Sequence, residues 1–524
     1  MLIALIFFLC LLSALAGFVL KRRGVRTAYI WMLLVFISLV LWLLLLIIPK
    51  DRFSPIIIND WFRFGDSNIS LRFVLNPQNW ILVISLFTFN LSFFLTGIAR
   101  LDVRNDLKNW IILLLLIAFS FLALISADLW SVVLLWTALD LLDFTFHRLI
   151  FKVVVGKTYY RKFIIKSLGS ILLIWNIAYL SRSGFNPLLN GIVSSTSTTS
   201  IFLAALLHSG IFPLNAETKN PPEEKSGELL RSAFSVLSFV VSFSLVTSLP
   251  APELPILISF VLSFLSYFLI ILSMIQWTLI KDLNNSLQFL LLGEASGFIF
   301  LYFSDASQYI TYILALNTLS VLWMALFTHR SKNLMIFPVI STFFASGLPI
   351  SLIAFGPRGF IGNGFSFGLV VLIFSQILFL YGYLRYAVKK NEKFNVLEVW
   401  YQASYLAGLF LPFLSAAAII FYSRISFADE IQFWWIGMIV VGLAVVGSFL
   451  SGRTNNLIKA PKYISQMRLS WIWQFMTFEW LFNTVSLIED RVRGFLNGFS
   501  GLMEGEGGIM CALVLLILIF SVLK

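Results

Sequence analysis

The sequence predicts an all-α polytopic membrane protein with about sixteen transmembrane helices. Hydrophobic residues make up 59% of the 524 positions, charged residues make up only 12%, and the mean hydropathy is +0.93. A soluble domain of this length would need far more charge to cover its surface. The apolar residues form continuous runs of about twenty, not the alternating segments of about ten that outer-membrane barrels use. Each run is therefore a candidate transmembrane helix.

The predicted helices follow these apolar runs along the chain. The first run has the length of a signal peptide, but its basic cluster Lys21–Arg23 follows the run instead of preceding it, so we expect a retained span. The runs cover residues 2–20, 28–48, 79–98, 109–126, 129–146, 164–181, 197–211, 228–248, 254–275, 286–303, 308–328, 334–354, 364–384, 402–422, 432–450 and 508–523.

The basic residues are distributed unevenly between the two sides of the membrane. If successive connections alternate sides, most of the 37 Lys and Arg residues fall on one side. This asymmetry is the positive-inside pattern, and it predicts that both termini lie outside. The lipid bilayer thus accounts for the net charge of +12, and we expect no nucleic-acid partner. The expected location is a bacterial or archaeal cytoplasmic membrane, with an organellar inner membrane as the alternative.

Two short sequences, each with Ser-Gly followed closely by a proline, indicate an internal repeat. One ends an apolar run at Pro213, and the other interrupts a later run at Gly347 and Pro349. Discontinuous helices at matching positions are typical of transporters built from inverted repeats. We therefore predict two inverted five-helix repeats with broken helices. The predicted divisions are N-terminal spans over 1–108, the repeats over 109–248 and 249–390, extra spans over 391–460, and two C-terminal segments over 461–505 and 506–524.

The C-terminal segments differ from the spans before them. Within 461–505, Trp471, Trp473, Phe475 and Trp480 recur at spacings that form one apolar stripe, with charged residues between them. This pattern is typical of an amphipathic helix lying along a membrane or along neighbouring helices. We expect a lateral helix here, followed by a terminal transmembrane helix over 506–524.

Two connections between the spans are long or strongly charged. Lys50–Asn76 is predicted to be an outside loop that folds against the membrane surface through Trp61, Phe62 and Phe64. Lys152–Lys166 is predicted to be a strongly basic cytoplasmic loop between the fifth and sixth spans.

Charged residues well inside apolar runs are costly, which makes them candidates for function. Asp140 and Asp143 lie three apart, on one face of the fifth helix, and His208, Glu294 and Arg358 lie in later runs. Together they can form a buried polar chain for proton movement. Simpler roles stay open: Asp143 marks a helix end, Glu294 caps a helix break, and Arg358 extends to the outer surface.

The sequence contains no arrangement typical of catalysis. It has no phosphate-binding glycine loop, no metal-ligand spacing and no activated nucleophile. Its two cysteines, Cys10 and Cys511, lie near opposite ends of the chain. We therefore expect no cofactor, no metal and no catalysis by this chain alone.

Several strings, in order along the chain, resemble one family. Leu134–Thr137 is similar to an apolar-Trp-Glu string, and His208–Leu214 is similar to Lys-Ser-Ala-x-x-Pro-Leu of a broken seventh helix. Leu229–Ala233 resembles Leu-Leu-His-Ala-Ala of the eighth helix, and Gly347–Arg358 resembles Gly-Leu-Pro…Gly-Phe-x-x-Lys of the twelfth. The chain thus resembles the antiporter-like subunits shared by respiratory complex I, membrane-bound hydrogenases and multisubunit cation/proton antiporters.

The departures from this family concern its proton-relay positions. The family's glutamate in the fifth helix corresponds to Thr137, with Asp140 one turn on as a possible substitute, and its lysine in the seventh corresponds to His208. Its histidine in the eighth helix corresponds to Arg231, a further relay candidate. The eleventh helix has no ionisable group around Val321, and Arg358 replaces the lysine of the twelfth. An arginine can hold a carboxylate charged but cannot release a proton.

The resemblance implies an antiporter-like membrane subunit of a complex I-type NADH:quinone oxidoreductase or related assembly, contributing to proton or cation translocation. Its partners would be other antiporter-like and small membrane subunits. Because the relay positions are altered, two alternatives stay open. One is a structural subunit that no longer pumps, and the other is the membrane partner of an inorganic-carbon-uptake system.

Overall fold

The computed structural model contains two compact units, residues 1–465 and 466–524. It describes residues 2–48, 53–64, 67–100, 106–151, 157–183, 188–189, 195–212, 225–249, 256–280, 283–303, 310–327, 329–330, 334, 337–338, 340–342, 367–388, 392–393, 398–422, 434–453, 480–484, 486–487, 491 and 494. The predicted lateral helix over 461–505 and terminal helix over 506–524 lie almost entirely outside these residues.

The first unit begins with a helical hairpin and a β-hairpin. Helix α1 (Leu2–Arg22) turns at Gly24, whose φ of 74° suits glycine, into α2 (Thr27–Ile47). Strands β1 (Ile56–Phe64) and β2 (Ser67–Phe73) pair antiparallel with a register shift between Ile58 and Phe62. Helix α3 (Pro77–Gly97) follows, with Pro77 in its first turn and the Asn76 side chain accepting a hydrogen bond from the Asn79 amide.

The other described helices of this unit follow the predicted apolar runs, except that α5 continues beyond residue 146 and α6 begins seven residues before residue 164. In chain order they are η2 (Ile98–Arg100), α4 (Asp106–Leu124), α5 (Leu129–Phe151), α6 (Lys157–Arg182), α7 (Ser195–His208), α8 (Lys225–Thr247), α9 (Ile256–Leu279), α10 (Leu283–Phe303), α11 (Ile310–Leu326), α14 (Phe367–Val388), α15 (Val399–Tyr422) and α16 (Trp434–Arg453). The predicted run 334–354 lies mostly outside the described residues. Two short strands, β3 (His329–Arg330) and β4 (Glu392–Lys393), pair in parallel.

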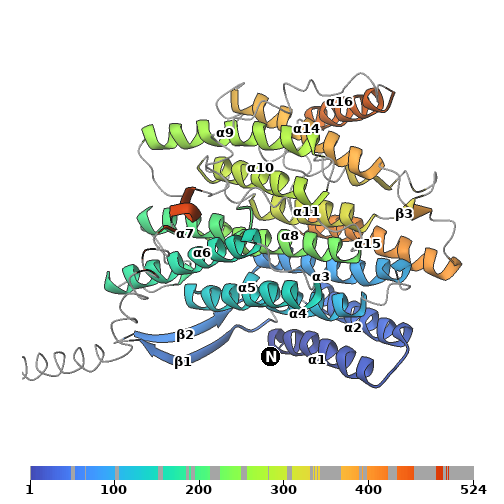
Figure 1. The fold of residues 1–524 in the computed structure, drawn as a ribbon, viewed down its shortest axis with the longest axis horizontal. Helices are drawn as coiled ribbons and strands as arrows, with labels where there is room; N and C mark the ends of the chain where they lie inside the picture. The colour runs from blue at the N-terminus through green and yellow to red at the C-terminus, as the bar shows by residue number, and fades with distance from the viewer. Residues whose placement is uncertain are drawn as a thin grey trace, which may run out of the picture. The chain divides into compact units, whose positions relative to one another are not determined.

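Eight helices in the described part of the chain are long and apolar enough to cross a membrane. They lie side by side with the shorter apolar helices, their axes running in similar directions (Figure 1). The prediction of an all-α polytopic membrane protein is confirmed. The division into two inverted repeats stays a prediction.

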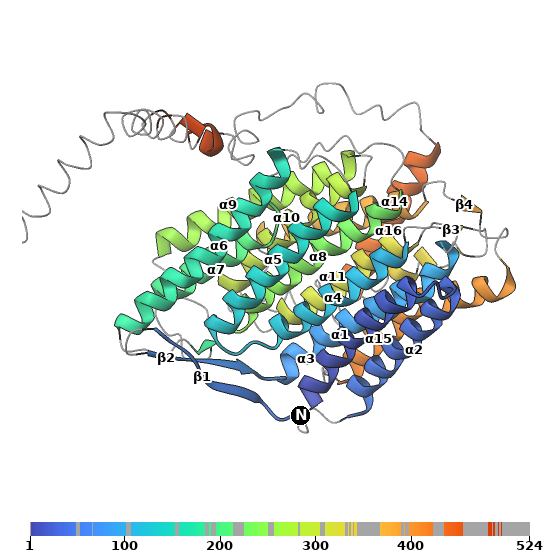
Figure 2. The same cartoon turned by 60° about the horizontal axis from the view of Figure 1, so that its bottom comes forward.

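Helix α3 lies at the centre of the first unit. It packs against α2, α4, α11 and α15 (Figure 2). Nearly all of its side chains are buried. Hydroxyl and amide groups join these helices where apolar contact alone would not fix their register. Thr88 of α3 lies 2.6 Å from the Ser415 hydroxyl of α15, and Asn90 Nδ2 donates to Ser38 of α2 at 3.0 Å. Such bonds between helices are typical of membrane bundles.

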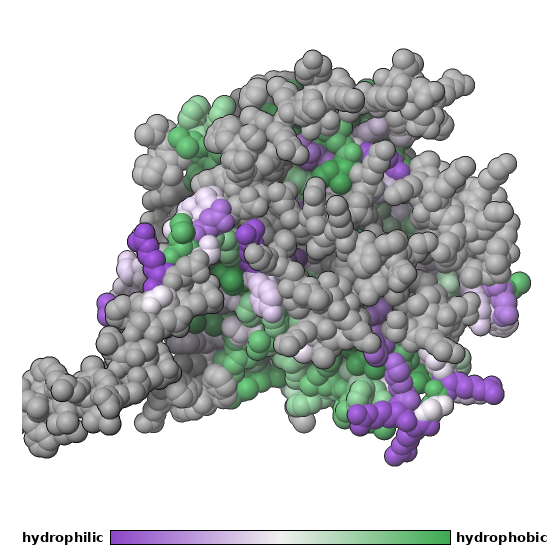
Figure 3. Space-filling model, in the orientation of Figure 1, coloured by the Kyte–Doolittle hydropathy of each residue, from purple (hydrophilic) through white to green (hydrophobic). Residues whose placement is uncertain are grey.

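The outer helices expose apolar side chains. Leu5, Phe8 and Leu12 of α1 are each about half exposed, and Phe260 and Phe264 of α9 are about two-thirds exposed. Figure 3 shows hydrophobic side chains over α1 and its neighbours. A soluble protein would bury such residues, so these faces fit contact with lipid or with another membrane helix.

Two predicted connections were wrong in detail. The segment expected to be an outside loop, Lys50–Asn76, contains the β1–β2 hairpin, because its β-branched and aromatic residues favour paired strands. The segment expected to be a basic loop, Lys152–Lys166, is helical from Lys157, and Lys166 is buried. Lys166 can be buried because carboxylates on the neighbouring helix balance its charge, as the following section describes.

Candidate functional site

Helix α5 supplies the two carboxylates of the site. Asp140 and Asp143 project from one face of the helix because residues three apart lie on the same side. Both side chains are buried, with 3% and 6% of their residue surface exposed. The structure therefore places both predicted candidates inside the protein, and Asp143 does not mark an exposed helix end.

Helix α6 supplies a lysine that the sequence pattern assigns to the basic loop. The Lys166 amine lies 3.1 Å from Asp143 Oδ2, to which it donates a hydrogen bond, and 3.4 Å from Asp140 Oδ1. A buried cation needs such partners, since desolvating an unpaired charge is very unfavourable. One feature of the sequence could have identified Lys166 as a site residue. This lysine lies within the apolar run 164–181, which follows the helix that carries the two aspartates.

Helix α7 supplies His208 as its last residue. The helix stops there because Gly210 adopts a φ of 72°, a left-handed conformation that commonly ends helices. Fourteen residues are too few for α7 to cross a bilayer alone. Helix α6 approaches α7 closely at Gly169. A Cβ atom at this position would lie 2.7 Å from the backbone oxygen of Ala204 and 3.0 Å from the backbone nitrogen of His208.

The His208 imidazole is enclosed on three sides. Its Nε2 lies 3.4 Å from Asp140 Oδ2, and its Nδ1 lies 2.8 Å from the Ser242 hydroxyl of α8. The indole of Trp136, one turn before Asp140, stacks on its face with ring centroids 3.9 Å apart and planes 6° from parallel. The ring is thus fixed in position and orientation and has no exposed surface.

The structure therefore gathers Asp140, Asp143, Lys166 and His208 into one buried site, which we call the α5–α7 cluster. Lys162, one turn before Lys166 on α6, also interacts electrostatically with both aspartates. The two lysines balance the charges of the two carboxylates when His208 is neutral. Within the described residues no group of three or more side chains has the arrangement of a metal site.

Glu294 lies outside the α5–α7 cluster. It lies on α10, is 9% exposed, and shares a hydrogen bond with the side chain of Asn317 on α11. Its Oε1 is buried without a hydrogen-bond partner. Among the described residues no Lys or Arg forms an ion pair with it. Glu294 is therefore an isolated buried carboxyl group in the second half of the unit.

Thr137 and Val321, which correspond to relay positions of the resembled family, do not take part in the α5–α7 cluster. Thr137 is exposed, and its hydroxyl donates to the Val133 oxygen of its own helix, whereas Asp140 points into the cluster. Val321 of α11 is buried and apolar. The other predicted site residues lie outside the described part of the chain: Pro213, Gly347, Pro349, Arg358 and the side chain of Arg231.

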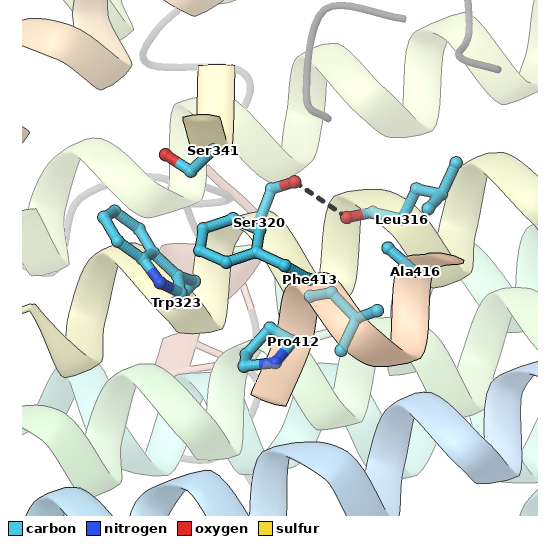
Figure 4. A pocket seen from close by; sticks show the side chains of 8 residues that line it. Leu316, Ser320, Trp323, Ser341, Pro412, Phe413 and Ala416 are labelled. Carbon is cyan, nitrogen blue, oxygen red and sulfur yellow. Dashed lines mark hydrogen bonds between the residues drawn. The ribbon is translucent and has the colours of Figure 1, made fainter. Parts of the chain in front are cut away.

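A small pocket lies between α11 and α15. Trp323 and Ser320 of α11 face Pro412 and Phe413 of α15, with Ser341 at one end (Figure 4). Pro412 cannot donate a backbone hydrogen bond, and within this stretch of α15 the Leu409 oxygen accepts one from the Trp323 indole at 3.0 Å. None of the residues lining the pocket is charged, so it offers no second site for ions.

No protein-family model matches the chain, and no curated protein matches it. Among solved structures it is similar to a chain in the structure of the Mrp complex from Dietzia sp. DQ12-45-1b, with 13% identity and a TM-score of 0.63. That match covers all of this chain and 63% of the other, so this chain spans less than two thirds of the Mrp chain's length.

A second similar structure is the membrane-bound sulfane sulfur reductase (MBS), an archaeal respiratory membrane complex. One of its chains matches with 12% identity and a TM-score of 0.63, and the match covers 99% of both chains. Likeness at these identities shows the fold. The chain therefore has the fold of an integral membrane component of such complexes, as its resemblance to the antiporter-like subunits predicted.

Proposed function

We propose that this chain is an antiporter-like membrane subunit that moves protons, or exchanges them for cations, across the membrane. The observation that carries the proposal is the α5–α7 cluster. It joins two carboxylates, a lysine and a histidine through contacts of 3.1 to 3.4 Å inside a bundle of membrane helices. Intramembrane ionisable residues of this kind mark ion pathways and proton relays.

Asp140 is the residue through which a proton would pass. It lies 3.4 Å from both Lys166 and His208, so its charge state affects the two neighbours together. When Asp140 binds a proton, it no longer holds Lys166, whose charge is then balanced by Asp143 alone. Histidine can accept and release protons near neutral pH, which makes His208 the natural next carrier.

A structural role is the second candidate function. Lys166 is already paired with both aspartates, and α11 provides no acidic or basic side chain to continue the path. A subunit of this kind would hold other membrane subunits in place without conducting protons. Its cluster would then be a fixed ion-pair network.

The proposed setting is a multisubunit membrane assembly. The two similar solved structures are membrane complexes, and the exposed apolar faces of this chain offer surfaces for lipid and for neighbouring subunits. A complex I-type oxidoreductase, a related antiporter and an inorganic-carbon-uptake system are the candidate assemblies. We place the chain in a bacterial or archaeal cytoplasmic membrane with both termini outside, following the positive-inside pattern.

Replacing Asp140 with Asn tests the proposal. The Asp140→Asn side chain keeps its size but cannot bind a proton, and Lys166 keeps Asp143 as its partner. The assembly carrying the variant would be reconstituted in sealed vesicles and its proton movement followed with a pH-sensitive dye. We expect movement to fall to background. Thr137→Val on the exposed face of the same helix is the matched control, and it should leave movement unchanged.

If Asp140→Asn conducts protons as well as the native assembly, the relay proposal is wrong and the structural role is favoured. Thermal unfolding of the same variant distinguishes loss of transport from loss of folding. A folded, inactive variant is the result that supports a relay.

A further inference from the structure

Ser242 of α8 contacts both His208 and its own helix. Its hydroxyl oxygen lies 2.8 Å from His208 Nδ1 and 2.7 Å from the backbone oxygen of Ser238, to which it donates. A serine hydroxyl has one proton to donate and two lone pairs to accept with. Because that proton goes to the Ser238 oxygen, the hydrogen in the other contact must come from the ring. Nδ1 of His208 therefore carries a hydrogen.

The hydrogen on Nδ1 determines whether the other ring nitrogen, Nε2, carries one. A neutral imidazole has hydrogen on one nitrogen only, so Nε2 presents a lone pair to Asp140 Oδ2, 3.4 Å away. Two acceptors that face each other in a buried site repel. Within the described structure, neither Nε2 nor either carboxylate oxygen of Asp140 has a hydrogen-bond partner. One proton between them, bound to either atom, turns the repulsion into a hydrogen bond.

We infer that Ser242 is a positioning residue that holds His208 with hydrogen on Nδ1, and that the gap between His208 Nε2 and Asp140 binds one exchangeable proton. The inference gives the proton of the proposed relay a location, and in that respect it rests on the proposed function. Lys166 and Lys162 of α6 are the neighbouring cations, and both interact electrostatically with Asp140.

Trp136 makes the inference testable with a small substitution. Because its indole covers the face of the imidazole, the ring keeps its plane when the Ser242 hydroxyl is removed. Ser242→Ala then releases the constraint on Nδ1 without opening the site. Nε2 becomes free to carry the hydrogen of the neutral ring and to donate it to Asp140.

Nitrogen-15 NMR of the full-length protein in lipid bilayers can measure which ring nitrogen carries hydrogen. The chain has three histidines, so His147→Gln and His329→Gln leave His208 as the sole histidine signal. We expect a protonated Nδ1 in the protein with Ser242, whether the ring is neutral or charged. In Ser242→Ala we expect this preference to be lost, with the neutral ring shifting to hydrogen on Nε2.

Ser244→Ala is the matched control, because Ser244 lies on the same helix and its hydroxyl donates to the Val241 oxygen. It should leave the histidine spectrum unchanged. An Nδ1 without hydrogen in the protein with Ser242 would overturn the inference. So would a Ser242→Ala spectrum identical to the native one at a pH at which the ring is neutral. The measurement does not need transport. A protonated Nδ1 in an assembly that moves no protons would support the inference and refute the proposed function.

Discussion

Lys166 is held between two buried carboxylates, 3.1 Å from Asp143 and 3.4 Å from Asp140. Breaking a buried ion pair by removing one partner costs about 3–5 kcal/mol, because the other charge is left uncompensated. Lys162 also interacts electrostatically with both carboxylates, but the ion pairs are made by Lys166. Removing Lys166 takes the directly paired lysine from both carboxylates, whereas removing either aspartate leaves Lys166 paired with the other. The cluster is therefore more sensitive to the loss of Lys166 than to the loss of Asp140.

We expect Lys166→Met to destabilise the protein strongly, and Lys166→Met combined with Asp143→Asn to recover part of the loss because it removes one unpaired anion. Thermal unfolding of the purified protein in lipid would measure both. Lys108→Met, at an exposed lysine near the start of α4, is the control and should change the melting temperature little. A single Lys166→Met variant as stable as the native protein would contradict the ion-pair assignment.

The site was only partly predictable from the sequence. Asp140, Asp143 and His208 were identified because a charged or titratable side chain within an apolar run is costly and is seldom kept there without a function or a buried partner. Lys166 was assigned to a loop, since it follows Lys157, Arg161 and Lys162 in a segment rich in positive charge. Its partners lie on another helix, 23 and 26 residues earlier in the chain. Only the packing of α5 against α6 brings them together.

At the scale of elements, the approach of α6 to α7 sets the geometry of the site. Gly169 lets the two helices touch backbone to backbone beside His208. A methyl group there would lie 2.7 Å from the Ala204 oxygen, which cannot give way without moving the helix. Because His208 is the last residue of α7, any displacement of α7 changes the 3.4 Å distance between His208 and Asp140.

We therefore expect Gly169→Ala to lower both proton movement and thermal stability, although alanine is a better helix former than glycine by about 1 kcal/mol. Gly442→Ala in α16 is the control, because nothing lies within 4 Å of the added methyl group. It should keep or slightly raise the melting temperature. If Gly169→Ala behaves like Gly442→Ala, then α6 and α7 are not in the close contact described.

Asp128 is one of the residues that fix the β1–β2 hairpin to the helical bundle. Asp128 precedes α5 and accepts hydrogen bonds from the Ser131 amide at 2.8 Å and the Ser131 hydroxyl at 2.7 Å, as a helix cap does. The same carboxylate accepts from the Arg72 amide of β2 at 2.6 Å. One carboxylate thus caps a helix and holds a strand.

Asp128→Ala should therefore loosen β2 and the start of α5 together. Hydrogen–deuterium exchange would show faster exchange at the Arg72 and Ser131 amides, and we expect stability to fall by about 1 kcal/mol, the usual effect of losing a cap. Ser126→Ala is the matched control, because that hydroxyl donates to the Leu122 oxygen of the preceding helix and not to the strand. Unchanged exchange at Arg72 would show that the hairpin is held by other contacts.

The elements themselves were predicted with unequal success, for physical reasons. Helix limits followed from the apolar runs because membrane thickness fixes how many residues a span needs. The hairpin was missed although Ile56, Ile57 and Ile58 favour a strand. A strand needs a partner, and although Asn68–Phe73 alternate between polar and apolar residues, the run Ile56–Ile58 does not. The attachment to Asp128 is a tertiary contact that no local pattern reveals.

At the scale of the whole molecule, most of the buried charges that the structure describes lie in one place. Among the described residues, the buried aspartate, glutamate, lysine and histidine side chains are Asp140, Asp143, Lys166, His208, Asp128 and Glu294. The first four form the α5–α7 cluster, Asp128 caps α5, and Glu294 stands alone in the second half. Among the described residues, this distribution favours the α5–α7 cluster as the proton-binding site of the proposed function.

Movement of protons also requires a defined orientation in the membrane. The positive-inside pattern predicts that the turn between α1 and α2 lies inside and that the end of α6 lies outside. Arg23 and Ser183 are exposed at these two places. In a background with Cys10→Ala and Cys511→Ala, a membrane-impermeant maleimide added to intact cells should label Ser183→Cys at once. It should label Arg23→Cys only after the membrane is permeabilised. The reverse order of labelling would invert the orientation, and labelling of both from outside would contradict the assignment of α1 to α6 as successive spans.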